Sequence, residues 1–283
     1  KEYLFNEEKQ KVDTKKFDVQ IFPRYHQLEL NRNLKEQVKN DGAGNNYLIQ
    51  HTTGSGKSYS IGWLSHLLTS LYKSKDDKKR IFDSIIIVTD RTNLDDQLRG
   101  TVKSLSKVDG VVFGAERGSR ELREFLEKGK DIIITTIQKF PYISEDINAL
   151  GDKKFAVIID EVHSSQNGEL SKELKRTLTR NEDDEEEEFT LESFLEEQIQ
   201  TRGRQKHISF FGFTGTPKEK TLEIFGTKQS DNKFKPQHVY SMRQSINEGY
   251  TLDVLQNYST YKRYFKVKEV KEDVIEIDTA QGT

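Results

Sequence analysis

The chain has 283 residues, and its 45 Lys and Arg against 47 Asp and Glu give a formal net charge of −2 at pH 7. Bulk charge therefore provides no argument for nucleic-acid binding, which has to rest on motifs. The absence of cysteine excludes disulfides, thiolate metal sites and cysteine nucleophiles. No apolar run reaches the roughly 18 to 20 residues that cross a bilayer, so we expect a cytoplasmic protein without a membrane partner.

Short apolar runs separated by helix-length segments predict the strands of one sheet. Several of these runs are continuously apolar, as in strands that helices cover on both faces. We therefore predict an α/β fold with a doubly wound parallel sheet and helices on both faces. Functional residues of such sheets lie beyond the carboxyl ends of the strands. The predicted strands are 47–50, 84–89, 111–113, 131–135, 155–160 and 208–214.

A phosphate-binding loop is predicted at 50–58, between the first strand and a helical pattern. Gly54 and Gly56 allow the backbone to turn so that several N–H groups point at one phosphate, and the helix start adds a positive dipole end. In this motif Lys57 contacts the β- and γ-phosphates and Ser58 binds Mg²⁺. The predicted nucleotide contacts of the loop are Thr53, Gly54, Ser55, Gly56, Lys57 and Ser58.

The strand at 155–160 ends in two carboxylates, Asp160 and Glu161, and Asp160 comes 103 residues after Lys57. We expect Asp160 to hold Mg²⁺ and Glu161 to orient or deprotonate the attacking water. Two buried acids without such a role would cost several kcal/mol. Together with the phosphate loop they predict nucleotide hydrolysis. The alternative is a P-loop phosphotransferase, which would need an acceptor pocket and a lid.

One segment departs from the alternation of strands and helices. Residues 182–188 are seven consecutive acids, within a polar insert at 180–206. Like charges repel and the run has no ligand spacing, so a solvated loop is favoured over a DNA-mimicking or metal-collecting role.

The stretches 160–163 and 213–217, in this order after the phosphate loop, resemble the motifs of superfamily-two helicases and translocases. The further stretches 24–27 and 89–97 narrow the resemblance to the motor of the type I restriction enzyme R subunit (HsdR), over roughly 22–250. The resemblance implies a RecA-like domain with ATP and Mg²⁺ as cofactors, and hydrolysis that drives translocation on double-stranded DNA. It also implies methyltransferase and specificity subunits as partners through the parent chain.

The resemblance also assigns roles to single residues. Gln27 would read the adenine edge with Tyr25 stacking nearby, and an ordinary surface amide is the alternative for Gln27. His163 would complete the catalytic set with Lys57, Asp160 and Glu161 as a hydrogen-bonding link. This link leads to the residues that would couple the γ-phosphate to the DNA groove, which are Thr214, Gly215 and Thr216.

The resemblance further implies that polar residues after two more strands grip the DNA backbone without reading its sequence. Capping of the following helices is the alternative for the threonines and for Asn93. The expected DNA contacts are Arg91, Asn93, Gln97, Thr135, Thr136, Gln138 and Lys139.

The resemblance divides the chain into a linker from an upstream domain (1–21), the RecA-like domain (22–250) and a connection toward a second RecA-like domain (251–283). A chain that starts at Lys1 is expected to be a piece of a larger polypeptide. Because the second domain supplies arginine fingers in the family, this segment is expected to bind ATP but turn it over weakly. The family's nuclease motif is not found in this segment.

Three alternatives to the restriction motor stay open. They are an RNA helicase, a nucleosome-type remodeller and a nucleotide-gated interaction module.

Overall fold

The computed structural model describes most of the predicted domain. The described residues are 2–6, 11–15, 20–74, 76–89, 92–106, 110–115, 119–136, 150, 153–162 and 206–253, and for 2–15, 92–97 and 119 the description is limited to the backbone. The predictions for Arg91, Gln138, Lys139 and His163, and the acidic insert as far as 205, lie outside this part of the chain.

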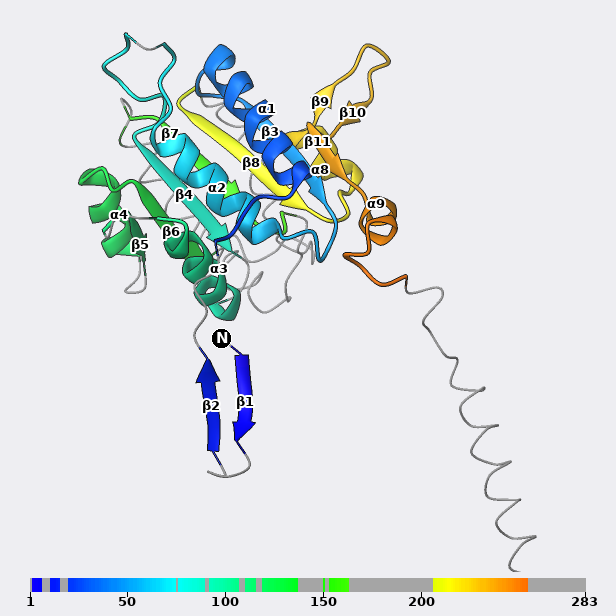
Figure 1. The fold of residues 1–283 in the computed structure, drawn as a ribbon. Coiled ribbons are helices and arrows are strands. Elements are labelled where there is room, and N and C mark those ends of the chain that lie inside the picture. Colours follow the sequence, from blue (N-terminus) through cyan, green and yellow to red (C-terminus); the bar gives the residue numbers. More distant parts are fainter. Residues whose placement is uncertain are drawn as a thin grey trace, which may run out of the picture.

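A seven-stranded parallel sheet forms the centre of the described part, in the order β11-β3-β8-β7-β4-β6-β5 (Figure 1). All six predicted strands are confirmed within two residues at each end. A further short strand, β11, adds to the edge beside β3 and was not predicted. The strands are β3 (Asn46–His51), β4 (Ser84–Thr89), β5 (Val112–Gly114), β6 (Ile132–Thr136), β7 (Phe155–Ile159), β8 (Ile208–Thr214) and β11 (His238–Tyr240).

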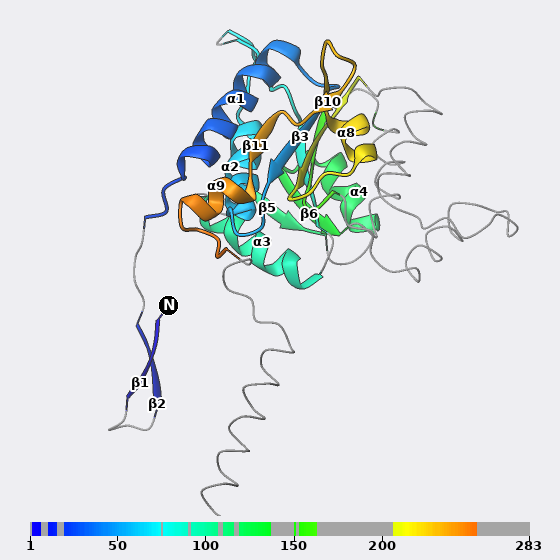
Figure 2. The same cartoon turned by 90° about the vertical axis from the view of Figure 1, so that its right-hand side faces the viewer.

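Helices cover both faces of this sheet (Figures 1 and 2). On one face lie α1 (Tyr25–Asp41), α2 (Lys57–Thr69) and α3 (Thr92–Ser104), and on the other α4 (Ser119–Glu127) and α8 (Glu219–Phe225). The chain then forms a hairpin of β9 (Thr227–Lys228) and β10 (Phe234–Lys235), and α9 (Met242–Asn247) follows β11.

Alternation along the strands explains the two cores. Ile85 and Ile87 of β4 pack into the cluster under α1, α2 and α3, whereas Ile86 and Val88 pack into the cluster under α4 and α8. A strand that is apolar at every position can bury both faces, which is why these runs do not alternate with polar residues. The doubly wound RecA-like α/β fold predicted from the sequence is confirmed.

The spacing of leucine and valine in α1 fixes how this helix packs. Leu30, Leu34 and Val38 recur every four residues and are fully buried. Residues at this spacing share one face of a helix, and burial of each such side chain contributes about 1.5 to 3 kcal/mol. This face packs into the core cluster with α2 and α3, and the first turn of α1 contacts the loop that follows β3, as described below.

The predicted N-terminal linker contains a pair of strands. Within 1–21, strands β1 (Glu2–Asn6) and β2 (Lys11–Lys15) pair in antiparallel register. The domain boundaries themselves stay predictions.

None of the described helices combines the length and the apolar character that a membrane crossing requires.

Candidate nucleotide site

Three loops with polar residues meet at the carboxyl edge of the sheet. Strand β8 lies between β3 and β7 and pairs with both. The predicted phosphate loop follows β3, the stretch 214–216 ends β8, and Asp160 and Glu161 follow β7. The topology therefore brings the two halves of the predicted site to one edge, with the predicted coupling residues between them.

The phosphate loop turns through two glycines. Gly54 and Gly56 have φ values of 82° and 81°, in the left-handed region that side chains with a Cβ rarely adopt. A Cβ on Gly56 would also lie 2.7 Å from Nε2 of Gln27. Helix α2 begins at Lys57 directly after this turn. The loop thus has the tight turn, made by two glycines, that the predicted phosphate binding requires.

Lys57 joins the two halves of the site. Its Nζ lies 2.8 Å from Oε1 of Glu161 and donates to the carbonyl of His51 at 3.3 Å. The Lys57 side chain is 10% exposed and that of Glu161 30%, so the pair is partly shielded from water. Glu161 has a φ of 54°, a conformation uncommon for a residue with a Cβ. Backbone strain of this kind is typical of functional sites.

The end of β8 packs directly against the phosphate loop. A Cβ on Gly215 would lie 3.6 Å from the carbonyl oxygen of His51 and 3.7 Å from the nitrogen of Thr53. The neighbouring Thr214 is fully buried, and its hydroxyl accepts from the backbone N–H of Thr216 at 3.3 Å. The three predicted coupling residues therefore adjoin the loop.

Gln27 is buried beneath the phosphate loop, which rules out the surface amide that the sequence left open. Its Nε2 donates to the carbonyls of Gly56 at 3.0 Å and Ser55 at 3.4 Å, and its Oε1 accepts from the backbone of Arg24 at 2.8 Å. The amide thus supports the loop backbone. Tyr25 is half exposed.

A layer of aromatic and acidic side chains lies beside Tyr25. The hydroxyls of Tyr25 and Tyr240 both donate to the carboxylate of Glu248, at 2.8 and 2.7 Å. The hydrogen bond to Glu248 raises the pKa of Tyr25 to about 12. The same two hydrogen bonds lower the pKa of Glu248, which therefore stays ionised.

Three histidines gather behind the loop, and the sequence analysis assigned none of them a role. His51 ends β3 where the strict phosphate-loop pattern has glycine, and its Nε2 lies 2.9 Å from Nδ1 of His238. The ring of His26 lies 5.3 Å from that of His51. Burial, together with the neighbouring His238, His26 and Lys57, lowers the pKa of His51 to about 2. His51 is therefore neutral at physiological pH.

Acidification is expected to destabilise the fold through His51. Its pKa of about 2 in the folded chain lies below the ordinary 6.5, so below pH 6.5 the unfolded chain binds a proton that the folded chain does not. Stability is present above this pH and is lost as the pH falls. His51 alone should lower the free energy of unfolding by about 1.4 kcal/mol between pH 7.5 and pH 5.5. Denaturant titrations at the two pH values measure this difference.

The matched variant for this titration is His51→Gln, which removes the titrating group and keeps a polar side chain. We expect a smaller pH effect in the variant than in the unaltered chain. The same loss of stability in both would show that His51 is not the responsible group. His26 and His238 also have lowered pKa values because of burial, so part of the pH dependence should persist.

The predicted DNA contacts are only partly within the described residues. Thr135 and Thr136 end β6 and are 1% and 6% exposed. Asn93 and Gln97 belong to the first two turns of α3, of which the structure describes the backbone. The DNA-binding roles of all seven residues stay predictions.

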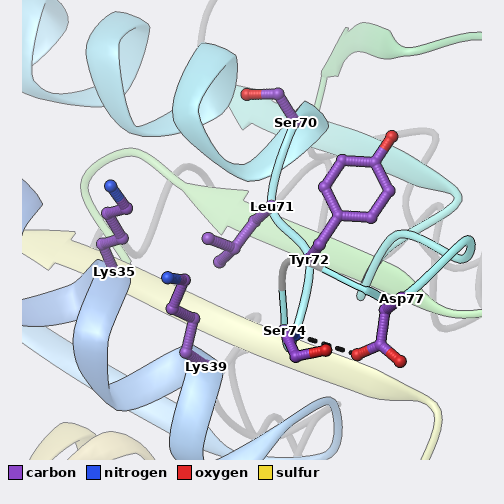
Figure 3. A pocket seen from close by; sticks show the side chains of 7 residues that line it. All are labelled: Lys35, Lys39, Ser70, Leu71, Tyr72, Ser74 and Asp77. Carbon is purple, nitrogen blue, oxygen red and sulfur yellow. Dashed lines mark hydrogen bonds between the residues drawn. The ribbon is translucent and has the colours of Figure 1, made fainter.

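A cavity of about 310 Å³ lies at the opposite end of α2 (Figure 3). Lys35 and Lys39 of α1 line one side of it, and Leu71, Tyr72 and Asp77 lie on the other. Helix α2 has 13 residues, which places its two ends about 20 Å apart. The cavity is therefore separate from the phosphate loop.

A glycine-turned loop after one parallel strand, joined by an ion pair to the acidic end of another, defines a P-loop nucleotide-hydrolase domain. A sequence model of the SWI2/SNF2 ATPase family matches residues 26–183. This match covers more than half of the chain, which therefore belongs to the SWI2/SNF2 ATPase family.

Curated relatives are subunits of restriction enzymes. The chain is 28% identical over 252 residues to a type I restriction enzyme endonuclease subunit of Staphylococcus aureus (strain COL). This alignment covers 84% of this chain and 22% of the relative. The chain is 27% identical over 224 residues to the corresponding HindI subunit of Haemophilus influenzae, covering 74% of this chain and 18% of the relative. The chain thus spans about a fifth of the length of these relatives.

A solved structure supports the fold. The nuclease-deletion mutant of the Type ISP restriction-modification enzyme LlaGI, in complex with a DNA substrate mimic, aligns with a TM-score of 0.51. The alignment covers 83% of this chain and 22% of the other, at 14% sequence identity. At this identity the likeness concerns the fold alone.

Proposed function

We propose that this chain is the ATP-binding motor domain of a type I restriction endonuclease R subunit. In this role ATP hydrolysis drives double-stranded DNA translocation, before cleavage by a separate nuclease domain of the parent chain. The observation that carries the proposal is the 2.8 Å ion pair between Lys57 and Glu161, which joins the phosphate loop to the strand that ends in two acids. The restriction-enzyme relatives supply the context for the track and the partners.

Nucleotide binding requires Lys57 to exchange partners. In the described structure its ammonium group faces Glu161, and a bound triphosphate would offer a denser negative charge at the same edge. Lys57 would then turn to the β- and γ-phosphates, while N–H groups of the loop and the start of α2 hold the remaining oxygens. After this exchange Lys57 would no longer pair with the Glu161 carboxylate, which could then orient or deprotonate water.

The residues at the site fit a magnesium ion that shares its ligands with a nucleotide. Among the described residues no group of three His, Asp or Glu side chains is arranged to hold a metal by itself. Mg²⁺ usually takes one or two protein ligands, the phosphates and water, and Ser58 and Asp160 would supply the protein ligands. When bound, the ion would neutralise charge that develops on the phosphates.

Coupling to DNA would start at the end of β8. Gly215 adjoins the backbone of His51 and Thr53, so a change in the loop on hydrolysis would displace the stretch 214–216. His163 would link this stretch to the acids of β7.

The seven predicted DNA contacts would hold DNA phosphates irrespective of base sequence. A motor of this kind would work in the cytoplasm with methyltransferase and specificity subunits.

The test is steady-state ATP hydrolysis by the full parent chain with its co-purifying subunits. Duplex DNA, single-stranded DNA and RNA are compared as stimulants, and Lys57→Ala is the blank. Stimulation by duplex DNA alone is expected. Stimulation by RNA would indicate a helicase, and no stimulation by any polymer would indicate a nucleotide-gated interaction module. Either result would overturn the restriction motor.

A further inference from the structure

We propose that His26 is a positioning residue for nucleotide binding: its Nε2–H holds the carbonyl of Ser55 so that the next peptide N–H faces the phosphates. The inference rests on the proposed ATP-binding function and deepens it. His26 is the second residue of α1, is 1% exposed, and lies between Tyr25 and Gln27. The Nε2 of His26 is 3.1 Å from the carbonyl oxygen of Ser55.

The direction of this hydrogen bond follows from its chemistry. A carbonyl oxygen accepts and never donates, so Nε2 of His26 carries the proton. Its Nδ1 is buried and has no hydrogen-bond partner within the part of the chain that the structure describes. Burial also lowers the pKa of His26. The ring is therefore the neutral Nε2–H tautomer, with one donor committed to the loop.

Peptide geometry converts this contact into control of the loop. In a planar trans peptide the C=O and the following N–H point in opposite directions. Anchoring the Ser55 carbonyl on the His26 side therefore turns the N–H of Gly56 away from His26. Gln27 does the same for the next peptide, because it donates to the carbonyl of Gly56 at 3.0 Å and the N–H that follows belongs to Lys57.

Anchoring matters most at the Ser55–Gly56 peptide, because the next carbonyl, that of Gly56, already accepts from the N–H groups of Tyr59 and Ser60 in α2 at 3.0 and 3.3 Å. Gly56 has a φ of 81° and no Cβ that would limit its rotation. The hydroxyl of Ser55 has no hydrogen-bond partner within the described residues and does not fix the loop. A phosphate site made of N–H groups binds well when they are oriented before the anion arrives. The adjacent donors of His26 and Gln27 supply this orientation.

A stacked ring holds His26 in place. The rings of His26 and Tyr240 are 3.8 Å apart and inclined by 10°, and Tyr240 belongs to the edge strand β11. The Tyr240 hydroxyl is tied to Glu248, just after α9, at 2.7 Å. Strand β11 also accepts from the loop itself, since the N–H of Thr52 donates to the carbonyl of Tyr240 at 3.1 Å. The start of α1, the end of α9 and strand β11 thus contact one another and lie together (Figure 2).

The experiment compares ATP binding, with Mg²⁺, by equilibrium titration of the unaltered chain and four variants, of which Lys57→Ala tests the proposed function. His26→Phe keeps a ring that can stack on Tyr240 but removes the donor, and its ATP affinity should fall about tenfold. His26→Gln returns a donor near the Nε2 position and should bind within about threefold of the unaltered chain. His66→Phe is the matched control, because His66 donates to the carbonyl of Val102 at 2.9 Å, between α2 and α3. The His66→Phe variant should change the stability of the fold but not its affinity for ATP.

The outcomes separate this inference from the proposed function. If Lys57→Ala binds ATP as well as the unaltered chain, the proposed function fails. If Lys57→Ala loses binding but His26→Phe does not, or if His26→Gln binds as weakly as His26→Phe, the positioning role alone is overturned. Should His26→Phe not fold, His26→Asn replaces it, since its shorter amide reaches only the Nδ1 position. His26→Gln should then bind ATP and His26→Asn should not, and equal binding by the two would refute the role.

Discussion

Replacing Lys57 with alanine is expected to weaken ATP binding about 100-fold, which corresponds to about 2.7 kcal/mol. The side chain is the cation at the start of α2, and its removal deletes a charged hydrogen bond to the phosphates. The loss exceeds that of a single contact because the charge of the Glu161 carboxylate, which pairs with Lys57 at 2.8 Å, would no longer be offset by Lys57 near the phosphates. Equilibrium titration with ATP and Mg²⁺ measures the change.

A double variant separates these two contributions. Lys57→Ala combined with Glu161→Gln removes the cation and the carboxylate together, so part of the lost affinity should return. The energetic coupling between the two changes is a direct measure of the interaction across the edge of the sheet. If Lys57→Ala binds ATP normally, the loop is not the phosphate site. If the double variant is no better than Lys57→Ala, repulsion by Glu161 contributes nothing.

The long strands of the sheet could be predicted because their residues carry the signal themselves. The runs at 84–89 and 208–214 match β4 and β8 at both ends, since each is apolar on both faces and bounded by polar residues. Strand β11 has three residues, His238, Val239 and Tyr240, and no apolar run. It is a strand because its backbone pairs with β3, a partner nearly 190 residues earlier. No local pattern contains that information.

Motifs could place residues in one site, but they could not show how the site is packed. Lys57 and Glu161 were placed in one site from their motifs, and the structure adds that they form an ion pair. The contacts of His26 with Ser55 and Tyr240 could not be predicted, because they depend on three segments far apart in the sequence. Two signals were available in hindsight. His51 occupies a glycine position of the loop motif, and a histidine precedes Gln27 in the first turn of α1.

The ion pair also explains why one carboxylate can serve two states of the site. Glu161 pairs with Lys57 at 2.8 Å and has a left-handed backbone conformation. Under the proposed function, transfer of Lys57 to the phosphates would leave this carboxylate to act on water. One side chain would then link substrate binding to the action of the base.

Glu161→Gln is therefore expected to separate binding from turnover. An amide cannot accept the proton of the attacking water, so kcat in the parent enzyme should fall about 1,000-fold. ATP affinity should be retained, because the loop, Lys57 and Ser58 remain and one negative charge near the phosphates is gone. Steady-state hydrolysis and equilibrium binding measured on the same preparation give both quantities. Glu124→Gln on the exposed face of α4 is the matched control, since it removes a carboxylate that pairs only at the surface with Lys128. Equal loss of ATP binding in Glu161→Gln and Lys57→Ala would refute this division of roles, because Glu161 would then be part of the binding site and not the base.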